Sequence, residues 1–204
     1  MIGLLIAGIS LGFSAGFSPG PLMVLIISQT LKHGYREGVK VACAPIITDI
    51  PIIIVTLLLL SYLSQNSNIL GLISIIGGFY LVYLAYGSFK TKPIEENFEI
   101  DEPKSFLKGA TVNFLSPNPY IFWITVGGPI TIAAYQIDPY SPLWFFFGFY
   151  TLLLGSKILL AVLVGKSRNF LTGKSYIYIM RFMGLLLMIF AVYLWWNGIH
   201  LILF

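Results

Sequence analysis

The stretch FSPGPLMVLI (Phe17–Ile26) places two prolines inside an otherwise apolar run. A second stretch, FLSPNPYIFW (Phe114–Trp123), repeats the same Ser-Pro-x-Pro pattern. Proline lacks a backbone N–H, and its ring clashes with the carbonyl four residues earlier, so it kinks or breaks a helix interior. The pattern therefore predicts two broken helices, each with a turn unwound around Gly20 or Asn118.

Both breaks lie in a chain that is too apolar to present a water-facing surface. Of its 204 residues, 57% are hydrophobic and 10% are charged, whereas soluble domains have roughly 45–50% apolar and about 25% charged residues. Most of the surface must therefore face lipid. The net charge of +4 comes from residues in short loops between apolar stretches, which is typical of topology signals and argues against nucleic acid as a partner.

Six windows can cross a bilayer, because a spanning helix needs about 20 largely apolar residues. They are residues 3–29, 41–63, 69–89, 109–134, 142–165 and 178–203. Eleven of the 12 Lys and Arg residues lie in or beside the first, third and fifth loops. By the positive-inside rule these loops are cytoplasmic. We therefore expect a multi-pass protein of the cell (plasma or inner) membrane with both termini outside.

The two Ser-Pro-x-Pro motifs begin at Ser18 and Ser116, in the first span of each three-span half. An odd number of spans makes the halves point in opposite directions, and such inverted repeats around broken helices are common in secondary transporters. The predicted fold class is an all-α integral membrane protein. Its six transmembrane helices form two inverted three-helix repeats with broken first and fourth helices. The repeats would comprise residues 1–90 and 109–204, joined by a charged cytoplasmic loop over residues 91–108.

Both breaks are expected near the middle of the membrane. At a helical rise of about 1.5 Å per residue, Pro19 lies roughly 20 Å from Lys32, and Pro117 lies roughly 14 Å from Lys108. The hydrocarbon core is about 30 Å thick. Each break starts a half-helix whose N-terminus carries partial positive charge and unpaired N–H donors. The two positive ends would converge on a site for a carboxylate. The alternative is a pair of proline kinks that serve packing only.

Two ionisable residues lie inside predicted spans, where such residues are expensive and mark function. Asp49 falls in the second span and Lys157 in the fifth, each nine residues from a lysine at the cytoplasmic edge. They could therefore meet across the bundle. Asp49 would bind a substrate ammonium or carry a proton, and Lys157 would neutralise Asp49 or hold a substrate carboxylate. The structural alternatives are a helix cap for Asp49 and snorkelling of Lys157 toward the inner headgroups.

Glycines recur every four residues along the first span, at Gly8, Gly12, Gly16 and Gly20. A ridge of small residues lets another helix approach closely. The ridge predicts close packing, either within the chain or across a homodimer.

The chain resembles the lysine-exporter (LysE-type) translocator family of small six-span amino-acid exporters. The resemblance is carried by GFSPGPLMVLIISQTLKHGYREGVKVACAPIITD (Gly16–Asp49) and GATVNFLSPNPYIFW (Gly109–Trp123), and it covers essentially the whole chain. It implies export of amino acids or related small solutes by proton exchange. Many members have Asn-Pro-Lys where this chain, aligned through Asn113, has Ser116-Pro117-Asn118. The lysine of the family is thus replaced by Asn118.

The candidate residues for substrate binding or coupling combine both motifs with the two intramembrane charges. They are Ser18, Pro19, Gly20, Pro21, Asp49, Asn113, Ser116, Pro117, Asn118, Pro119 and Lys157. The expected partners are an amino acid or similar zwitterion, protons and the bilayer. No catalytic residue, cofactor or metal site is predicted, because the sequence shows no ligand cluster, no nucleophile with its base and no nucleotide-binding motif. The alternatives are an inorganic cation or metal-ion exporter and, less favoured, a membrane-embedded enzyme.

Overall fold

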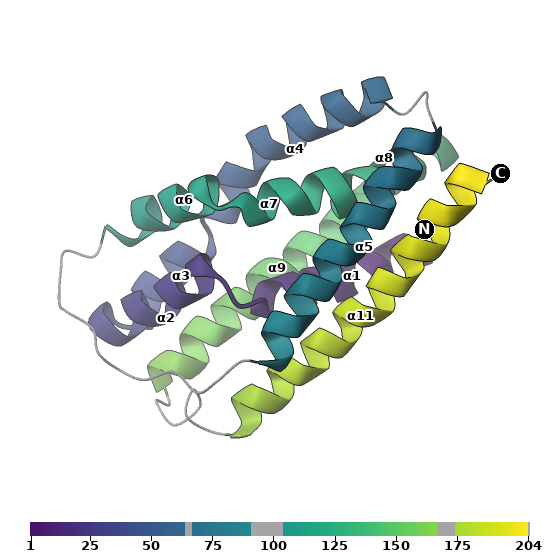
Figure 1. The fold of residues 1–204 in the computed structure, drawn as a ribbon. Helices are drawn as coiled ribbons and strands as arrows, with labels where there is room; N and C mark the ends of the chain where they lie inside the picture. Colours follow the sequence, from purple (N-terminus) through teal and green to yellow (C-terminus); the bar gives the residue numbers. More distant parts are fainter. Residues whose placement is uncertain (64–66, 91–103, 167–173, 204) are drawn as a thin grey trace.

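The structure is a computed structural model that describes residues 1–63, 67–90, 104–166 and 174–203. These residues form helices and no strand (Figure 1). In chain order the elements are α1 (Ile2–Phe17), α2 (Pro21–His33), α3 (Tyr35–Ala42), α4 (Pro45–Leu63), α5 (Ser67–Phe89), α6 (Ser105–Leu115), α7 (Pro117–Phe122), the π-helical segment η1 (Trp123–Gly127), α8 (Gly128–Ile137), α9 (Ser141–Lys166) and α11 (Lys174–Leu203).

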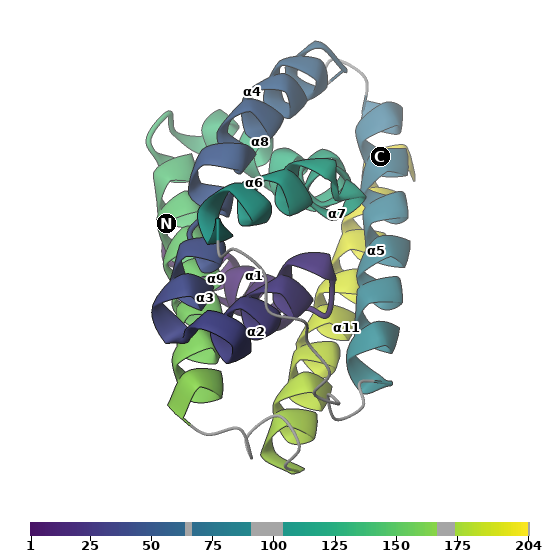
Figure 2. The same ribbon diagram turned by 90° about the vertical axis from the view of Figure 1, so that its left-hand side faces the viewer.

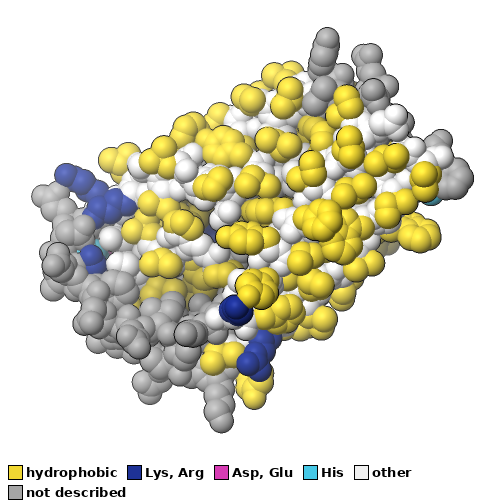
Figure 3. Space-filling view, viewed as in Figure 1, with side chains coloured by type: hydrophobic (Ala, Val, Ile, Leu, Met, Phe, Trp, Pro, Cys, Tyr) yellow, Lys and Arg dark blue, Asp and Glu magenta, His cyan; other side chains and the backbone are white. Residues whose placement is uncertain are grey.

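The helices include five that are long and apolar enough to cross a membrane, or six if α1 and α2 form one span bent by 61°. Hydrophobic side chains cover the flank of the bundle, and Lys and Arg gather toward one end of it (Figure 3). Large apolar side chains of α4, such as Ile47, Ile54 and Leu58, are exposed. The prediction of an all-α membrane protein is therefore confirmed.

The turn between the first two spans is much tighter than the apolar windows predict. The helix α2 continues to His33 and α3 begins at Tyr35, so only Gly34 separates them. Gly34 has a φ of 90°, a left-handed conformation that glycine adopts without steric cost. Hydropathy misses these helical turns because they carry polar and charged side chains.

The glycine ridge of α1 packs against α9 within the same chain. A Cβ atom added at Gly16 would lie 2.5 Å from the Cβ of Ser156, and one added at Gly8 or Gly12 would collide with the backbone of α9. The prediction of close packing is confirmed, and the partner is α9 and not a second copy. Gly20, the fourth glycine of the series, lies outside this contact in the break between α1 and α2.

A second close contact joins α5 to α11. Small residues recur every seven positions on both helices, at Gly71, Gly78 and Ala85 and at Gly184, Ala191 and Gly198. They pair in antiparallel order, with Gly71 facing Gly198, Gly78 facing Ala191 and Ala85 facing Gly184. A seven-residue repeat keeps one seam of each helix on its partner, as in left-handed coiled coils.

The two broken spans lie between these helix pairs. Figure 2 shows α6 and α7 beside α1 and α2, with α5 along one side. The helix α2 contacts α6 directly, and α4 contacts α6, α7 and α8. The fold therefore brings both Ser-Pro-x-Pro segments to the centre of the bundle.

Candidate functional site

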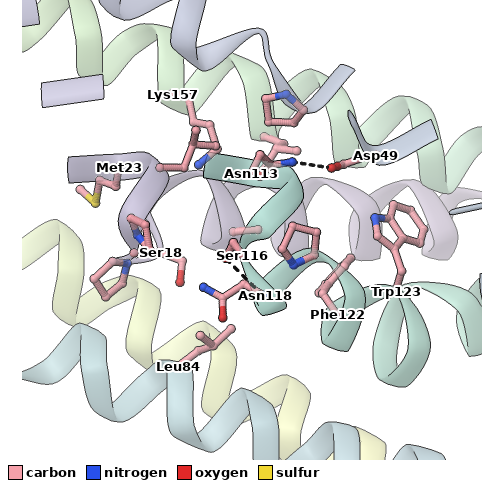
Figure 4. Close-up of a pocket in the computed structure, with 18 of the residues that line it drawn as sticks. Ser18, Met23, Asp49, Leu84, Asn113, Ser116, Asn118, Phe122, Trp123 and Lys157 are labelled. Carbon is pink, nitrogen blue, oxygen red and sulfur yellow. Dashed lines mark hydrogen bonds between the residues drawn. The ribbon is translucent and has the colours of Figure 1, made fainter. Parts of the chain in front are cut away.

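A cavity of about 110 Å³ lies between the two breaks (Figure 4). A volume of about 10–15 Å³ is enough for one water molecule, so this cavity has room for several waters or a small solute. All predicted site residues except Pro117 line it. The other lining residues are Ala15, Leu22, Met23, Pro45, Tyr80, Leu84, Phe122, Trp123, Phe149 and Leu153.

The first break separates α1 from α2 over residues 18–20. Ser18 and Gly20 have extended backbones, with φ/ψ of −59°/129° and 177°/175°. Pro21 then opens α2 at the first helical position, where its missing N–H costs nothing. The unwound turn predicted around Gly20 is therefore confirmed.

The second break is smaller than predicted. Only Ser116 leaves helical geometry, with φ/ψ of −73°/135°, and α7 resumes at Pro117. The prediction of an unwound turn around Asn118 is wrong, because prolines at the first and third positions of a helix lack only N–H groups that have no intrahelical acceptor. The Ser116 hydroxyl caps this new helix by accepting from the Asn118 N–H at 3.4 Å.

The two breaks meet at Asn118. A Cβ atom added at Gly20 would lie 3.4 Å from the Asn118 Nδ2, so the side chain of the second break reaches the backbone of the first. From α5, the Tyr80 hydroxyl donates to the Asn118 carbonyl at 3.2 Å. The same helix contacts the first break, since a Cβ at Gly87 would lie 3.5 Å from Pro19. Asn118 thus occupies the junction of the two motifs.

The fourth span carries a further deformation that was not predicted. The π-helical segment η1 follows α7, and Pro129 lies two residues after it. Pro129 has no N–H to donate to the carbonyl of Thr125, four residues earlier. A widened turn is a common response to such an interruption and is frequent at functional sites. It places Trp123, a wall residue of the cavity, at the start of η1.

Asp49 is buried in α4, with 5% of its surface exposed. Its Oδ1 accepts from the Asn113 amide at 2.9 Å, and its Oδ2 accepts from the Tyr150 hydroxyl at 3.1 Å. The Asn113 amide also donates to the Thr48 hydroxyl at 2.7 Å. These donors are side chains of α6 and α9, so Asp49 does not act as a backbone cap of its own helix. The carboxylate instead ties three spans together.

Lys157 is equally buried in α9, with 5% of its surface exposed. Its amine donates to the Gly16 carbonyl at 3.4 Å, in the last turn of α1, where a helix carries partial negative charge. The structure therefore contradicts snorkelling toward the headgroups. An ammonium has three donors, and Figure 4 shows this one turned toward the cavity.

Asp49 and Lys157, both in the described part of the chain, face one cavity without forming a direct ion pair. Asp49 is bonded to Asn113 and Tyr150, and Lys157 is bonded to Gly16. The two groups nevertheless interact electrostatically. The site thus offers a negative and a positive group at separate positions on its wall.

Sequence reasoning missed three polar residues of the site, namely Thr48, Tyr80 and Tyr150. The two tyrosines had a usable signal, because a tyrosine hydroxyl inside an apolar span normally finds a hydrogen-bond partner. Thr48 had none, since threonine can bond to its own helix, as this one does with the Ala44 carbonyl at 3.1 Å. In the part of the chain that the structure describes, no group of three or more His, Cys, Asp or Glu side chains could hold a metal ion.

Comparison with known proteins agrees with this geometry. A family model described as LysE type translocator matches residues 13–198. No curated protein and no solved structure gave a match. The matched region contains both breaks, Asp49 and Lys157, and extends over nearly the whole chain. This multi-pass membrane protein therefore belongs to the LysE type translocator family, whose members are membrane exporters.

Proposed function

We propose that this translocator is a secondary active exporter of amino acids or related small solutes, which leave the cytoplasm in exchange for protons. The observation that carries the proposal is the cavity between the two helix breaks, which a buried carboxylate and a buried amine both face. Transporters with broken helices bind their substrates at such points.

The first half-helix supports recognition of a solute carboxylate. Pro21 has no N–H, and the first intrahelical bond of α2 runs from the Val24 N–H to the Gly20 carbonyl at 3.1 Å. The N–H groups of Leu22 and Met23 therefore have no acceptor within the helix. With the partial positive charge of the helix N-terminus and the Lys157 amine, they favour a carboxylate.

Asp49 would couple solute movement to protons. An ionised carboxylate has about four acceptor sites. Asn113 and Tyr150 use two of them, and the Trp123 side chain also interacts with the carboxylate by hydrogen bonding. A solute ammonium would bind at the remaining sites, and a proton would remove the negative charge that attracts it. The proton and the solute would therefore exclude each other at Asp49, which is the competition that exchange requires.

We further propose that residues 1–90 and 109–204 are inverted repeats joined by residues 91–108. Support comes from the pairing of the spans. The first span packs on the fifth through α1 and α9, the fourth packs on the second through α6, α8 and α4, and the third packs on the sixth through α5 and α11. If the first, second and third spans are exchanged with the fourth, fifth and sixth, the same three pairs of spans result. Two equivalent halves would give this pattern.

The proposed orientation in the cell membrane rests on charge. Both termini lie at one end of the bundle (Figure 1), and the Lys and Arg side chains visible in Figure 3 lie toward the other end. By the positive-inside rule the basic end would be cytoplasmic and the termini would lie outside.

The test is counterflow and pH-driven flux in proteoliposomes that contain the purified protein. A panel of radiolabelled amino acids and divalent cations would be offered with and without an imposed pH gradient. We expect at least one amino acid to exchange and to accumulate when the gradient is applied. Movement of a cation and of no amino acid would reject the proposal in favour of an inorganic-ion exporter.

A further inference from the structure

We propose that the cavity selects zwitterionic amino acids whose side chains are apolar and excludes those whose side chains are charged. This inference rests on the proposed function and concerns the same cavity. The selectivity follows from two observations. Several polar groups of the cavity wall are already hydrogen-bonded within the protein, and the largest other side chains of the wall are apolar.

Charge matching sets the first limit on the solute. Among the described residues that line the cavity, Asp49 is the only acid and Lys157 the only base. The ammonium and carboxylate shared by all amino acids would use both. A third charge, on a lysine, arginine or glutamate side chain, would be buried without a counter-ion, which is strongly unfavourable.

Most neutral polar groups of the wall are also occupied. The Asn113 amide donates to both Thr48 and Asp49. The Tyr80 hydroxyl donates to the Asn118 carbonyl, and the Ser116 hydroxyl accepts from the Asn118 N–H. These bonds hold the broken helix in shape, so a solute hydroxyl or amide that took one of them would leave another buried group unsatisfied.

Apart from the Ser18 hydroxyl and the Asn118 side-chain amide, the rest of the described wall is mainly apolar and comes from four different spans. Its largest side chains are Leu22, Met23, Leu84, Phe122, Phe149 and Leu153. Figure 4 shows Met23 at one end of the site and Phe122 at the other, with Leu84 below Asn118. Methionine is flexible and polarisable, so this wall can fit aliphatic side chains of differing shape. Leucine and methionine have the expected combination of charge and apolar surface.

The experiment is competition in proteoliposomes loaded with unlabelled leucine. Entry of radiolabelled leucine would be measured with excess methionine, lysine, arginine, glutamate or leucinamide outside. We expect methionine to reduce entry about tenfold, and the charged amino acids and leucinamide to reduce it less than about twofold. Leucinamide keeps the side chain and the amine but lacks the carboxylate, so it tests whether both charges are needed.

A variant that adds a charge to the cavity wall tests the same inference, because it should admit a solute of opposite charge. Leu84→Asp places a carboxylate in the cavity near Asn118, and Leu84→Asn is the matched uncharged control. We expect lysine to compete about tenfold better in Leu84→Asp than in Leu84→Asn. If Leu84→Asp still exchanges leucine and lysine competes no better than in Leu84→Asn, the apolar wall does not determine selectivity.

The outcomes separate the two proposals. If lysine or glutamate competes with leucine as well as methionine does, the selectivity is refuted and the exporter stands. If lysine or arginine exchanges and leucine does not, the apolar selection is likewise refuted while amino-acid transport is retained. If no amino acid exchanges at all, the proposed function fails, and the selectivity fails with it.

Discussion

Asp49 lies in a mostly apolar interior because Asn113 and Tyr150 each donate to one of its oxygens. A buried carboxylate without such donors would be prohibitively unstable. Lys157 has one long bond, at 3.4 Å, whereas ordinary N–H···O bonds are about 2.9–3.0 Å long. The acid is therefore firmly held by the protein, and the amine retains capacity for a ligand.

The first prediction concerns Asp49→Asn, which keeps the shape of the side chain and removes its titration. Flux driven by a pH gradient should fall to the level of empty liposomes, because the proposed proton carrier is gone. Asp138→Asn is the matched control, since Asp138 lies at the end of α8 and its carboxylate accepts from the nearby Tyr140 N–H. Full coupling in Asp49→Asn would exclude this residue as the carrier.

The second prediction concerns Tyr150→Phe, which removes one hydroxyl and leaves the ring in place. The Oδ2 of Asp49 would lose the hydrogen bond from this hydroxyl, and an unsatisfied buried acceptor costs about 1–3 kcal/mol. The melting temperature in detergent and the initial exchange rate should both fall. Tyr83→Phe alters an exposed tyrosine and should change neither. Equal values for the two variants would show that the bond to Asp49 is unimportant.

Sequence reasoning finds the charged residues of the cavity and the residues of the two motifs, but it misses Thr48, Tyr80 and Tyr150. Asp49 and Lys157 stand out because charge is rare at that depth. The roles of Thr48 and Tyr150 depend on how α4, α6 and α9 are placed relative to one another. No periodicity within a single helix contains that information.

At the scale of helices, the structure rests on backbone contacts that small residues permit. Gly148 of α9 shows this clearly, because an added Cβ would lie 2.7 Å from the Leu5 carbonyl oxygen and 3.0 Å from the Ile9 nitrogen. Both are backbone atoms, so α1 itself would have to move. Gly155 on the same helix would meet nothing within 4 Å.

The third prediction compares Gly148→Ala with Gly155→Ala. Gly148→Ala should lower stability by about 1–3 kcal/mol through overpacking, and the melting temperature should fall with it. Gly155→Ala should leave stability unchanged or raise it slightly, because alanine is a better helix former by about 1 kcal/mol. If both variants melted alike, the close approach of α1 and α9 would be refuted.

Helix breaks are only partly readable from sequence. The pattern Ser-Pro-x-Pro predicts both breaks, yet residues 18–20 leave the helix in one copy and Ser116 alone does so in the other. The difference is consistent with the intervening residue, since Gly20 adopts a fully extended backbone, whereas Asn118 stays helical beneath the Ser116 cap. The sequence does not reveal the η1 segment, because Pro129 lies within an apolar window and no second proline pattern marks it.

At the scale of the whole molecule, the pairing of spans supports the proposed inverted repeats, and the distribution of charge supports the proposed orientation in the membrane. Sequence indicates the number of spans and the side that carries the basic residues. It cannot show which spans touch, because contacts between α1 and α9 or between α5 and α11 join residues far apart in the sequence, such as Gly8 with Phe145 and Gly71 with Gly198. The mirrored pairing therefore emerges only in three dimensions.

The fourth prediction concerns orientation. Single cysteines at Arg36 and Asp138 would be introduced in a Cys43→Ala background, since Cys43 is the only native cysteine. In intact cells a membrane-impermeant maleimide should label the cysteine at position 138, and it should reach position 36 only after the membrane is opened. Labelling of both positions in intact cells would contradict the proposed topology.

The central claim is that the two broken helices meet at one cavity and that solute passes between them. The most direct measurement is cross-linking of Gly20→Cys to Asn118→Cys in the Cys43→Ala background, followed by exchange assays in proteoliposomes. The account predicts an intramolecular cross-link that stops exchange and, when formed as a disulfide, releases it again on reduction. Pairing Gly155→Cys with Asn118→Cys is the control and should not cross-link. Failure of the first pair to cross-link, or full exchange in the cross-linked protein, would contradict the account.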